Sequence, residues 1–270
     1  MHATAAVAER LNETLVPDGA FAACNDALED PAELRRRMRR DGYLFARGLA
    51  DRDALRRVRR EVLELCRKYG WLRTDAPLMD GLYRGGPFPE FGTEYQRLYK
   101  ELIRLDTFNA FSISMELMTF LEKVVDGIVL AHRRNIARIS FPGHAAFTTQ
   151  PHQDFVHIRG TPETYTAWIP LGDCPRELGG LTVLEGSHDL GFVQHVPAIG
   201  AGGAGVPTAD LGMRWLAEDF EAGDVLLVHS HTIHAALPNV TADRLRLSVD
   251  FRYQRAGEPI EQASMRLHGG

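Results

Sequence analysis

The second half of the chain carries the feature that most limits its fold. Short apolar or alternating runs follow one another there, separated by turn residues and without helical stretches between them. Strands are predicted after Pro142 at residues 165–171, 181–184, 224–229 and 245–253. Closely spaced strands without intervening helices predict an antiparallel sandwich or barrel and exclude a parallel βαβ sheet. We therefore expect a mainly β fold, with helices from the first half flanking a β core of about residues 135–255.

Helix signals concentrate in the first half. Asp30 is a suitable N-cap, Pro31 fits the first helical turn and Gly42 fits the end of the same helix. After Asp51, apolar residues recur at helical spacing while Arg and Glu fill the other face. The predicted elements are a helix at 31–41, a strand at 43–47, a helix from Asp51, a helix from Phe108 to about Leu130 and a strand at 135–141.

Three segments are expected to be irregular. Residues 1–29 are Ala-rich with weak periodicity, which predicts a loosely packed N-terminal arm. Residues 71–100 combine Gly and Pro with aromatic residues, so they either wall a ligand pocket or pack as a long loop. The Gly-rich stretch 198–207 is expected to be a mobile surface loop near one end of the barrel.

Composition narrows the choice of partners. The chain has 31 Lys and Arg against 36 Asp and Glu, a formal charge of -5, which disfavours nucleic acid and anionic membranes as partners. Cys24, Cys66 and Cys174 form no CxxC pair, which favours a reducing compartment over a disulfide framework. No stretch approaches the roughly 20 apolar residues needed to cross a bilayer. We expect one cytoplasmic domain over residues 1–270, acting on a small-molecule or protein partner.

His152 and Asp154 form the strongest local chemical signal. Residues two apart in a strand point to the same side, so the imidazole and the carboxylate can converge on one point. One nitrogen and one oxygen donor suit a divalent first-row metal. A His-x-Asp pair also occurs by chance as a hydrogen-bonded surface pair, so a metal site requires a third ligand.

Candidates for that ligand lie at His229, His231 and His234. Two histidines and one carboxylate on a single face, with other positions open, favour non-haem Fe(II) and oxygen chemistry. Strand alternation pairs His229 with His231, whereas His234 lies past the predicted strand end. Spacing alone does not select among the three.

A polar face on the last long strand is the third signal. Arg244, Arg246 and Ser248 alternate with Leu245 and Leu247. A guanidinium and a nearby hydroxyl can hold a carboxylate through charge-assisted hydrogen bonds. An edge strand with its arginines in water would show the same pattern.

Together these residues resemble the phytanoyl-CoA dioxygenase (PhyH) family of Fe(II)/2-oxoglutarate oxygenases. The similarity spans about residues 35–255 in the family's order. It rests on Asp41-Gly-Tyr-Leu-Phe45, His152-x-Asp154, Trp168-Ile-Pro-Leu171, Gly179-Gly-Leu-Thr-Val-Leu-Glu-Gly-Ser-His188, Gly223-Asp-Val-Leu-Leu-Val-His229, His234 with Pro238-Asn239, and Arg246-Leu-Ser248.

The resemblance implies a double-stranded β-helix, the jelly-roll or cupin-like barrel, with flanking helices. It implies that His152, Asp154 and His234 bind Fe(II). It also implies that Arg246 with Ser248, or Arg244 instead, holds the far carboxylate of 2-oxoglutarate. Two residues have looser implied roles: Arg138 is expected to face co-substrate or substrate, and Trp168 either walls the pocket or is plain core packing.

The implied activity is O2-dependent hydroxylation, or another oxidation, of an unactivated C–H in a small molecule. It is coupled to decarboxylation of 2-oxoglutarate to succinate, and the substrate is expected to be a natural-product intermediate. Family members that halogenate lack the metal carboxylate, so Asp154 favours oxygenation. Pocket walls are expected from 71–100, 108–118, 157–164 and 195–210.

Two alternatives remain beside this interpretation. A cupin-like metalloenzyme would use the same β architecture without 2-oxoglutarate and would be indifferent to loss of Arg246 and Arg244. A non-catalytic binding module on the same fold is the other alternative, because a fold does not determine a function.

Overall fold

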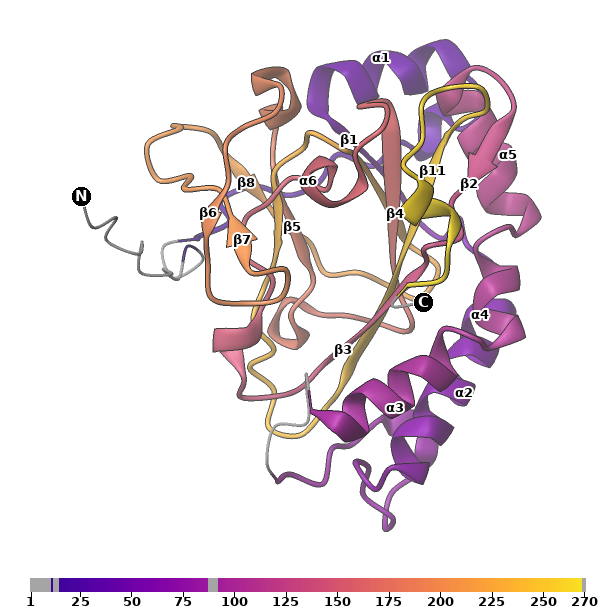
Figure 1. Cartoon of the computed structure of the whole chain (residues 1–270), viewed down its shortest axis with the longest axis vertical. Coiled ribbons are helices and arrows are strands. Elements are labelled where there is room, and N and C mark those ends of the chain that lie inside the picture. The colour runs from indigo at the N-terminus through magenta and orange to yellow at the C-terminus, as the bar shows by residue number, and fades with distance from the viewer. Residues whose placement is uncertain (1–10, 12–14, 87–91, 269–270) are drawn as a thin grey trace.

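The computed structural model describes residues 11, 15–86 and 92–268 (Figure 1). The helices are α1 (Pro31–Asp41), α2 (Arg52–Lys68), α3 (Thr93–Leu102), α4 (Asp106–Phe111), α5 (Met115–Val125) and α6 (Phe155–Ile158). The strands are β1 (Tyr43–Ala46), β2 (Val129–Ala131), β3 (Ile136–Ser140), β4 (Thr164–Pro170), β5 (Leu181–Leu184), β6 (Val196–Pro197), β7 (Ala204–Gly205), β8 (Trp215–Leu216), β9 (Val225–His229), β10 (His234–Ala236) and β11 (Arg246–Arg255).

Two antiparallel sheets form the body of the molecule. The larger sheet has the order β1-β9-β4-β11-β2, with β3 also paired to β11, and the smaller sheet has the order β10-β5-β8. The prediction of antiparallel pairing is confirmed. The prediction of a mainly β chain holds only for the second half, because α1 to α5 make the first half largely helical and the described chain is mixed.

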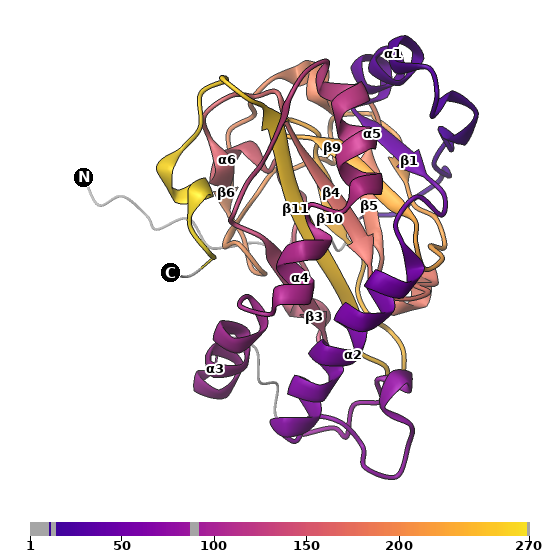
Figure 2. The same ribbon diagram turned by 90° about the vertical axis from the view of Figure 1, so that its right-hand side faces the viewer.

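Alternation along the strands builds two apolar layers. Leu227 of β9 and Phe251 of β11 pack with the helices, while Leu226 and Val228 of β9 pack with Val183 of the smaller sheet. Figure 2 shows α2, α4 and α5 lying over the outer face of the larger sheet. The inner face of that sheet therefore looks toward the smaller sheet, and polar residues on it are enclosed.

The first two helices form where the sequence predicts them. The Asp30 carboxylate accepts a hydrogen bond from the Glu33 backbone N–H, and Gly42 ends α1 in the left-handed conformation at φ 76°. Asp51 caps α2 through the backbone N–H of Ala54. These caps satisfy backbone groups that a helix end would otherwise leave unpaired.

The prediction of a loosely packed arm is wrong for residues 15–29. Phe21 lies among Tyr43, Phe45 and Phe220, with ring centroids 5.3 to 5.9 Å apart, and the backbone N–H of Cys24 donates to Phe45 O. Irregular backbone shows no periodicity, so the sequence pattern missed this packing. The earlier part of the predicted arm, except residue 11, lies outside the described residues.

Other boundaries also differ from the predictions. Residues 71–100 contain most of α3, because Leu98 and Leu102 bury an apolar stripe despite the Gly-rich approach. The predicted helix 108–130 is split into α4, α5 and β2, with a turn at residues 112–114 and Asp126 in the left-handed conformation. Residues 198–207 include one strand of the β6–β7 hairpin, so the predicted structureless loop is wrong there.

Two further observations concern the cysteines and the length of the helices. The cysteines Cys24, Cys66 and Cys174 are free and buried. Among the described residues, none of the helices has the length and apolar character required to span a membrane.

Replacing Phe108 by Ala should lower the free energy of unfolding by about 3–5 kcal/mol, because its ring is fully buried against Phe251 and would leave a cavity. The matched change Phe192→Ala removes a ring that is 51% exposed and should cost only about 0.5 kcal/mol. Urea unfolding of both variants measures the difference. Equal losses would contradict the assignment of α4 to the core.

Candidate active site

His152, Asp154 and His234 converge between the two sheets. Their ligand atoms lie within 4.8 Å of one another, and all three side chains are buried. His152 and His234 exchange two backbone hydrogen bonds of 3.0 Å, which sets their ring centroids 4.3 Å apart. In the described part of the chain, this is the one group of three or more His, Cys, Asp or Glu side chains suited to a metal ion.

Backbone carbonyls orient both imidazoles. Nδ1–H of His152 donates to Gln150 O and Nδ1–H of His234 donates to Thr232 O, each at 2.9 Å. These bonds place the proton on Nδ1 and leave Nε2 of each ring with a free lone pair. His152 Nε2 lies 3.8 Å from Asp154 Oδ1. The donor set of two imidazole nitrogens and one carboxylate oxygen fits Fe(II).

Asp154 is held by two neighbouring strands. Its Oδ2 accepts a hydrogen bond from Thr166 Oγ1 at 2.6 Å, and its Oδ1 accepts one from an Arg252 guanidinium nitrogen at 3.1 Å. Thr166 on β4 pairs directly with Arg252 on β11. The register of the larger sheet therefore fixes the carboxylate beside the two histidines.

Burial and charge set the protonation of these groups. Burial alone would raise the pKa of Asp154, but the Arg252 charge, the nearby histidines and the Thr166 hydrogen bond hold it well below its ordinary value. Burial and the neighbouring His234 lower the pKa of His152. An ionised carboxylate and a neutral imidazole are the forms that bind metal.

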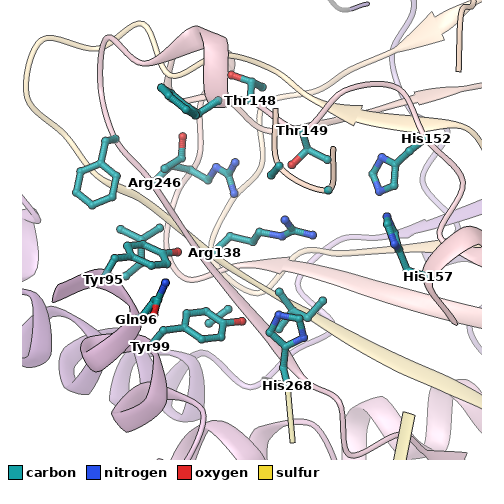
Figure 3. A pocket seen from close by; sticks show the side chains of 18 of the residues that line it. Tyr95, Gln96, Tyr99, Arg138, Thr148, Thr149, His152, His157, Arg246 and His268 are labelled. Atoms are coloured by element: carbon teal, nitrogen blue, oxygen red, sulfur yellow. The ribbon is translucent and has the colours of Figure 1, made fainter. Parts of the chain in front are cut away.

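A cavity of about 750 Å³ opens on the His152 and Asp154 side chains. Figure 3 shows it running from His152 and His157 past Arg138 to Arg246 and to the aromatic residues of α3. Its walls come from α3, β3, the turn after β3, the β6–β7 hairpin and β11. The site is thus accessible to a ligand of appreciable size.

The structure separates the two candidate arginines. Arg246 lines the cavity and donates to Ser248 Oγ at 2.7 Å, whereas Arg244 is not among the lining residues and lies near Arg59. Arg138 also lines the cavity and forms a 2.9 Å ion pair with Asp250. Arg246, Ser248 and Arg138 therefore occupy one region, without Arg244.

Trp168 combines packing with a place near the site. It is buried, and its ring lies 4.7 Å from that of Phe220. It does not line the large cavity. It lines a gap of about 30 Å³ beside Arg246 and beside the metal group, which consists of His152, Asp154 and His234.

The other two late histidines lie apart from the metal group. His229 Nε2 faces Glu163 at 3.6 Å, and the His231 ring packs against Phe155 at 4.8 Å. The chain turns between β9 and β10, so His234 enters the smaller sheet while His229 stays in the larger one.

Sequence reasoning missed two supporting residues. Arg252 continues the alternation of Arg246 and Ser248 along β11. The sequence pattern therefore already showed that the polar face extends beyond Ser248. Gln153 is fully buried and cross-links two loops: its amide nitrogen donates to Gly191 O and His231 O at 2.7 Å, and its oxygen accepts from the Val193 N–H. No local signal distinguishes such a glutamine.

The expected pocket walls are partly confirmed. Tyr95 and Tyr99 of the 71–100 segment, His157, and Ala201 with Gly202 line the cavity. The expectation for 108–118 is wrong, because none of these residues lines the cavity. Phe108, Phe111 and Leu117 pack into the helix-covered core instead. Phe88 and Phe91 lie outside the described residues.

Known proteins resemble this chain in sequence and in fold. Residues 38–247 match the family model described as Phytanoyl-CoA dioxygenase (PhyH). The chain is 30% identical over 249 residues to 1-deoxypentalenic acid 11-beta-hydroxylase from Streptomyces arenae, covering 87% of this chain and 85% of that protein. The protein of the same name from Streptomyces exfoliatus is 28% identical over 249 residues, with the same coverage.

A solved structure of the epimerase SnoN in complex with Fe3+, alpha ketoglutarate and nogalamycin RO has a TM-score of 0.61 to this chain at 23% identity. The alignment covers 86% of this chain and 85% of that one, and it shows a shared fold. The family match spans most of the chain and the metal group lies within it. The chain therefore belongs to the phytanoyl-CoA dioxygenase family and is a 2-oxoglutarate-dependent iron oxygenase.

Proposed function

We propose that this oxygenase hydroxylates an unactivated C–H of a small natural-product intermediate and converts 2-oxoglutarate to succinate and CO2. The observation that carries the proposal is the buried His152, Asp154 and His234 group opening on a 750 Å³ cavity that Arg246 also lines. The relative named 1-deoxypentalenic acid 11-beta-hydroxylase supports hydroxylation of a small molecule. We also propose that the two facing sheets correspond to the double-stranded β-helix of this family.

Each group of the chain has a distinct part in this proposal. His152, Asp154 and His234 would hold Fe(II), which with 2-oxoglutarate and O2 supplies the oxidising chemistry. Arg246 and Ser248 would bind the far carboxylate of 2-oxoglutarate, with Arg138 nearby. Arg252 and Thr166 orient Asp154, and the enclosing sheets limit access of water. The position of the substrate C–H relative to the metal group would decide the site of oxidation.

The two earlier alternatives make different demands on these residues. A cupin-like enzyme without 2-oxoglutarate does not need an arginine that lines the cavity and is held by a serine hydroxyl. A binding module does not need a buried, ionised carboxylate beside two buried imidazoles. The arrangement around Arg246 and Asp154 supports the oxygenase over both.

Replacing His152 by Ala should abolish the weak visible charge-transfer band that Fe(II) and 2-oxoglutarate produce together without oxygen, because the metal loses one of its three protein ligands. His234→Ala should do the same. His229→Ala and His231→Ala are matched controls that should retain the band, since both histidines lie outside the metal group. Anaerobic spectroscopic titration measures each variant; retention of the band in the His152 and His234 variants would contradict the ligand assignment.

Replacing Arg246 by Gln should raise the KM for 2-oxoglutarate by roughly 10- to 100-fold, because one charge-assisted interaction with a carboxylate is lost. Arg244→Gln should leave this KM nearly unchanged. Succinate release at varied 2-oxoglutarate concentrations gives both values. A larger rise of this KM in Arg244→Gln than in Arg246→Gln would assign the 2-oxoglutarate carboxylate to Arg244. An unchanged KM in both variants would favour the cupin-like alternative.

A further inference from the structure

Gln153 is the residue between the histidine and the aspartate of the His-x-Asp pair. Its side chain is fully buried, and it lines neither the 750 Å³ cavity nor the gap of about 30 Å³. The amide nitrogen donates to Gly191 O and His231 O, each at 2.7 Å, and the amide oxygen accepts from the Val193 N–H at 2.8 Å. Both N–H groups and the oxygen of this amide are therefore used within the protein.

The turn between β9 and β10 carries His234 to the metal group. His152 exchanges two backbone hydrogen bonds with His234, and on the other side of the turn the Phe155 N–H donates to Ser230 O at 3.0 Å. Between these bonded positions one segment has three residues and the other has two, so the β ladder is interrupted there. The amide of Gln153 spans the interruption through its hydrogen bond to the turn.

The other two partners of this amide belong to the segment after β5. Gly191 and Val193 precede the β6–β7 hairpin, whose connecting loop lines the cavity. The Gln153 backbone N–H also donates to His195 Nε2 at 3.1 Å, and His195 Nδ1–H donates to Val193 O at 2.9 Å. Gln153 therefore joins the His-x-Asp pair both to the turn before β10 and to the approach to the hairpin.

An amide is the chemical group that suits residue 153. Two backbone carbonyls require two N–H donors and one backbone N–H requires an acceptor, and a glutamine side chain offers this combination in one planar group. A carboxylate there would face two carbonyl oxygens with no N–H to donate. An apolar side chain of similar length would leave three backbone groups unpaired. The amide itself, and not only its volume, therefore holds these segments together.

We infer that Gln153 is a positioning residue of the metal centre. Its side chain holds the His-x-Asp pair against the turn that carries His234, so that the three ligand atoms converge before a metal ion binds. The inference rests on the proposed assignment of His152, Asp154 and His234 as the iron ligands. Loss of the amide should weaken metal binding without removing a ligand, because hydrogen bonds outside the ligand set hold the ligands in place.

Gln254 provides a matched control. It is also fully buried, its amide nitrogen donates to Glu258 O at 3.0 Å and to Pro259 O at 3.3 Å, and its oxygen accepts from His132 Nε2–H at 2.8 Å. These partners lie after β11 and just after β2, and none belongs to the turn before β10. A change at Gln254 therefore removes as many side-chain hydrogen bonds as a change at Gln153 and leaves that turn intact.

Each glutamine is replaced by Met and, as a milder change, by Asn. Anaerobic competition with a chromophoric chelator gives the Fe(II) dissociation constant of each variant. Gln153→Met should weaken Fe(II) binding by roughly 10- to 100-fold and Gln153→Asn by a smaller factor. Both Gln254 variants should stay within about twofold of the wild-type value. Since the ligands are intact, excess Fe(II) with 2-oxoglutarate should restore the charge-transfer band in Gln153→Met, whereas it should not in His152→Ala.

A wild-type Fe(II) dissociation constant in both Gln153 variants overturns the inference. So does equal weakening in the Gln254 variants, which would indicate a general loosening of the fold, or a band in Gln153→Met that excess Fe(II) does not restore. Urea unfolding of the metal-free proteins identifies variants that do not fold; if both Gln153 variants alone fail to fold, the residue serves stability and the inference is overturned. A wild-type Fe(II) dissociation constant in His152→Ala refutes the proposed ligand assignment instead.

Discussion

The buried ion pair between Asp154 and Arg252 is the interaction on which the site depends. Both side chains are about 4% exposed, and a carboxylate in such a place stays ionised only with a matching charge and hydrogen bonds. Arg252 supplies the charge and Thr166 a second hydrogen bond, and they belong to adjacent strands. The antiparallel register of β4 and β11 is therefore a chemical requirement as well as an architectural one.

Strand β11 joins stability and chemistry in one element. Leu247, Val249 and Phe251 pack under the helices, while Arg246 and Arg252 face the cavity from the other side. A one-residue slip would exchange these faces, burying charge in the core and removing Arg246 and Arg252 from the cavity. The helices of the first half thus support the site indirectly, by covering the apolar face of the strand that carries it.

The cavity has a part that is anchored to the two sheets and a part that comes from elements outside them. His234 and Arg246 belong to strands, His152 forms a bridge to His234, and Asp154 is the N-cap of α6. Tyr99 comes from α3 and His268 from the end of the described chain. The catalytic groups of a shared fold can stay in place while segments such as these change the accepted substrate.

The sequence by itself determined the antiparallel second half, the caps of α1 and α2, and the His-x-Asp pair, because periodicity and local hydrogen bonding act over a few residues. It also displayed the polar face of β11. Spacing left open which of His229, His231 and His234 meets His152, and only the family resemblance pointed to His234. The tertiary structure brings His234 to His152, because a turn between sheets sends neighbouring histidines to different places. The same reason applies to Gln153, Arg252 and the packed residues 15–29: their roles arise from contacts between segments distant in the chain.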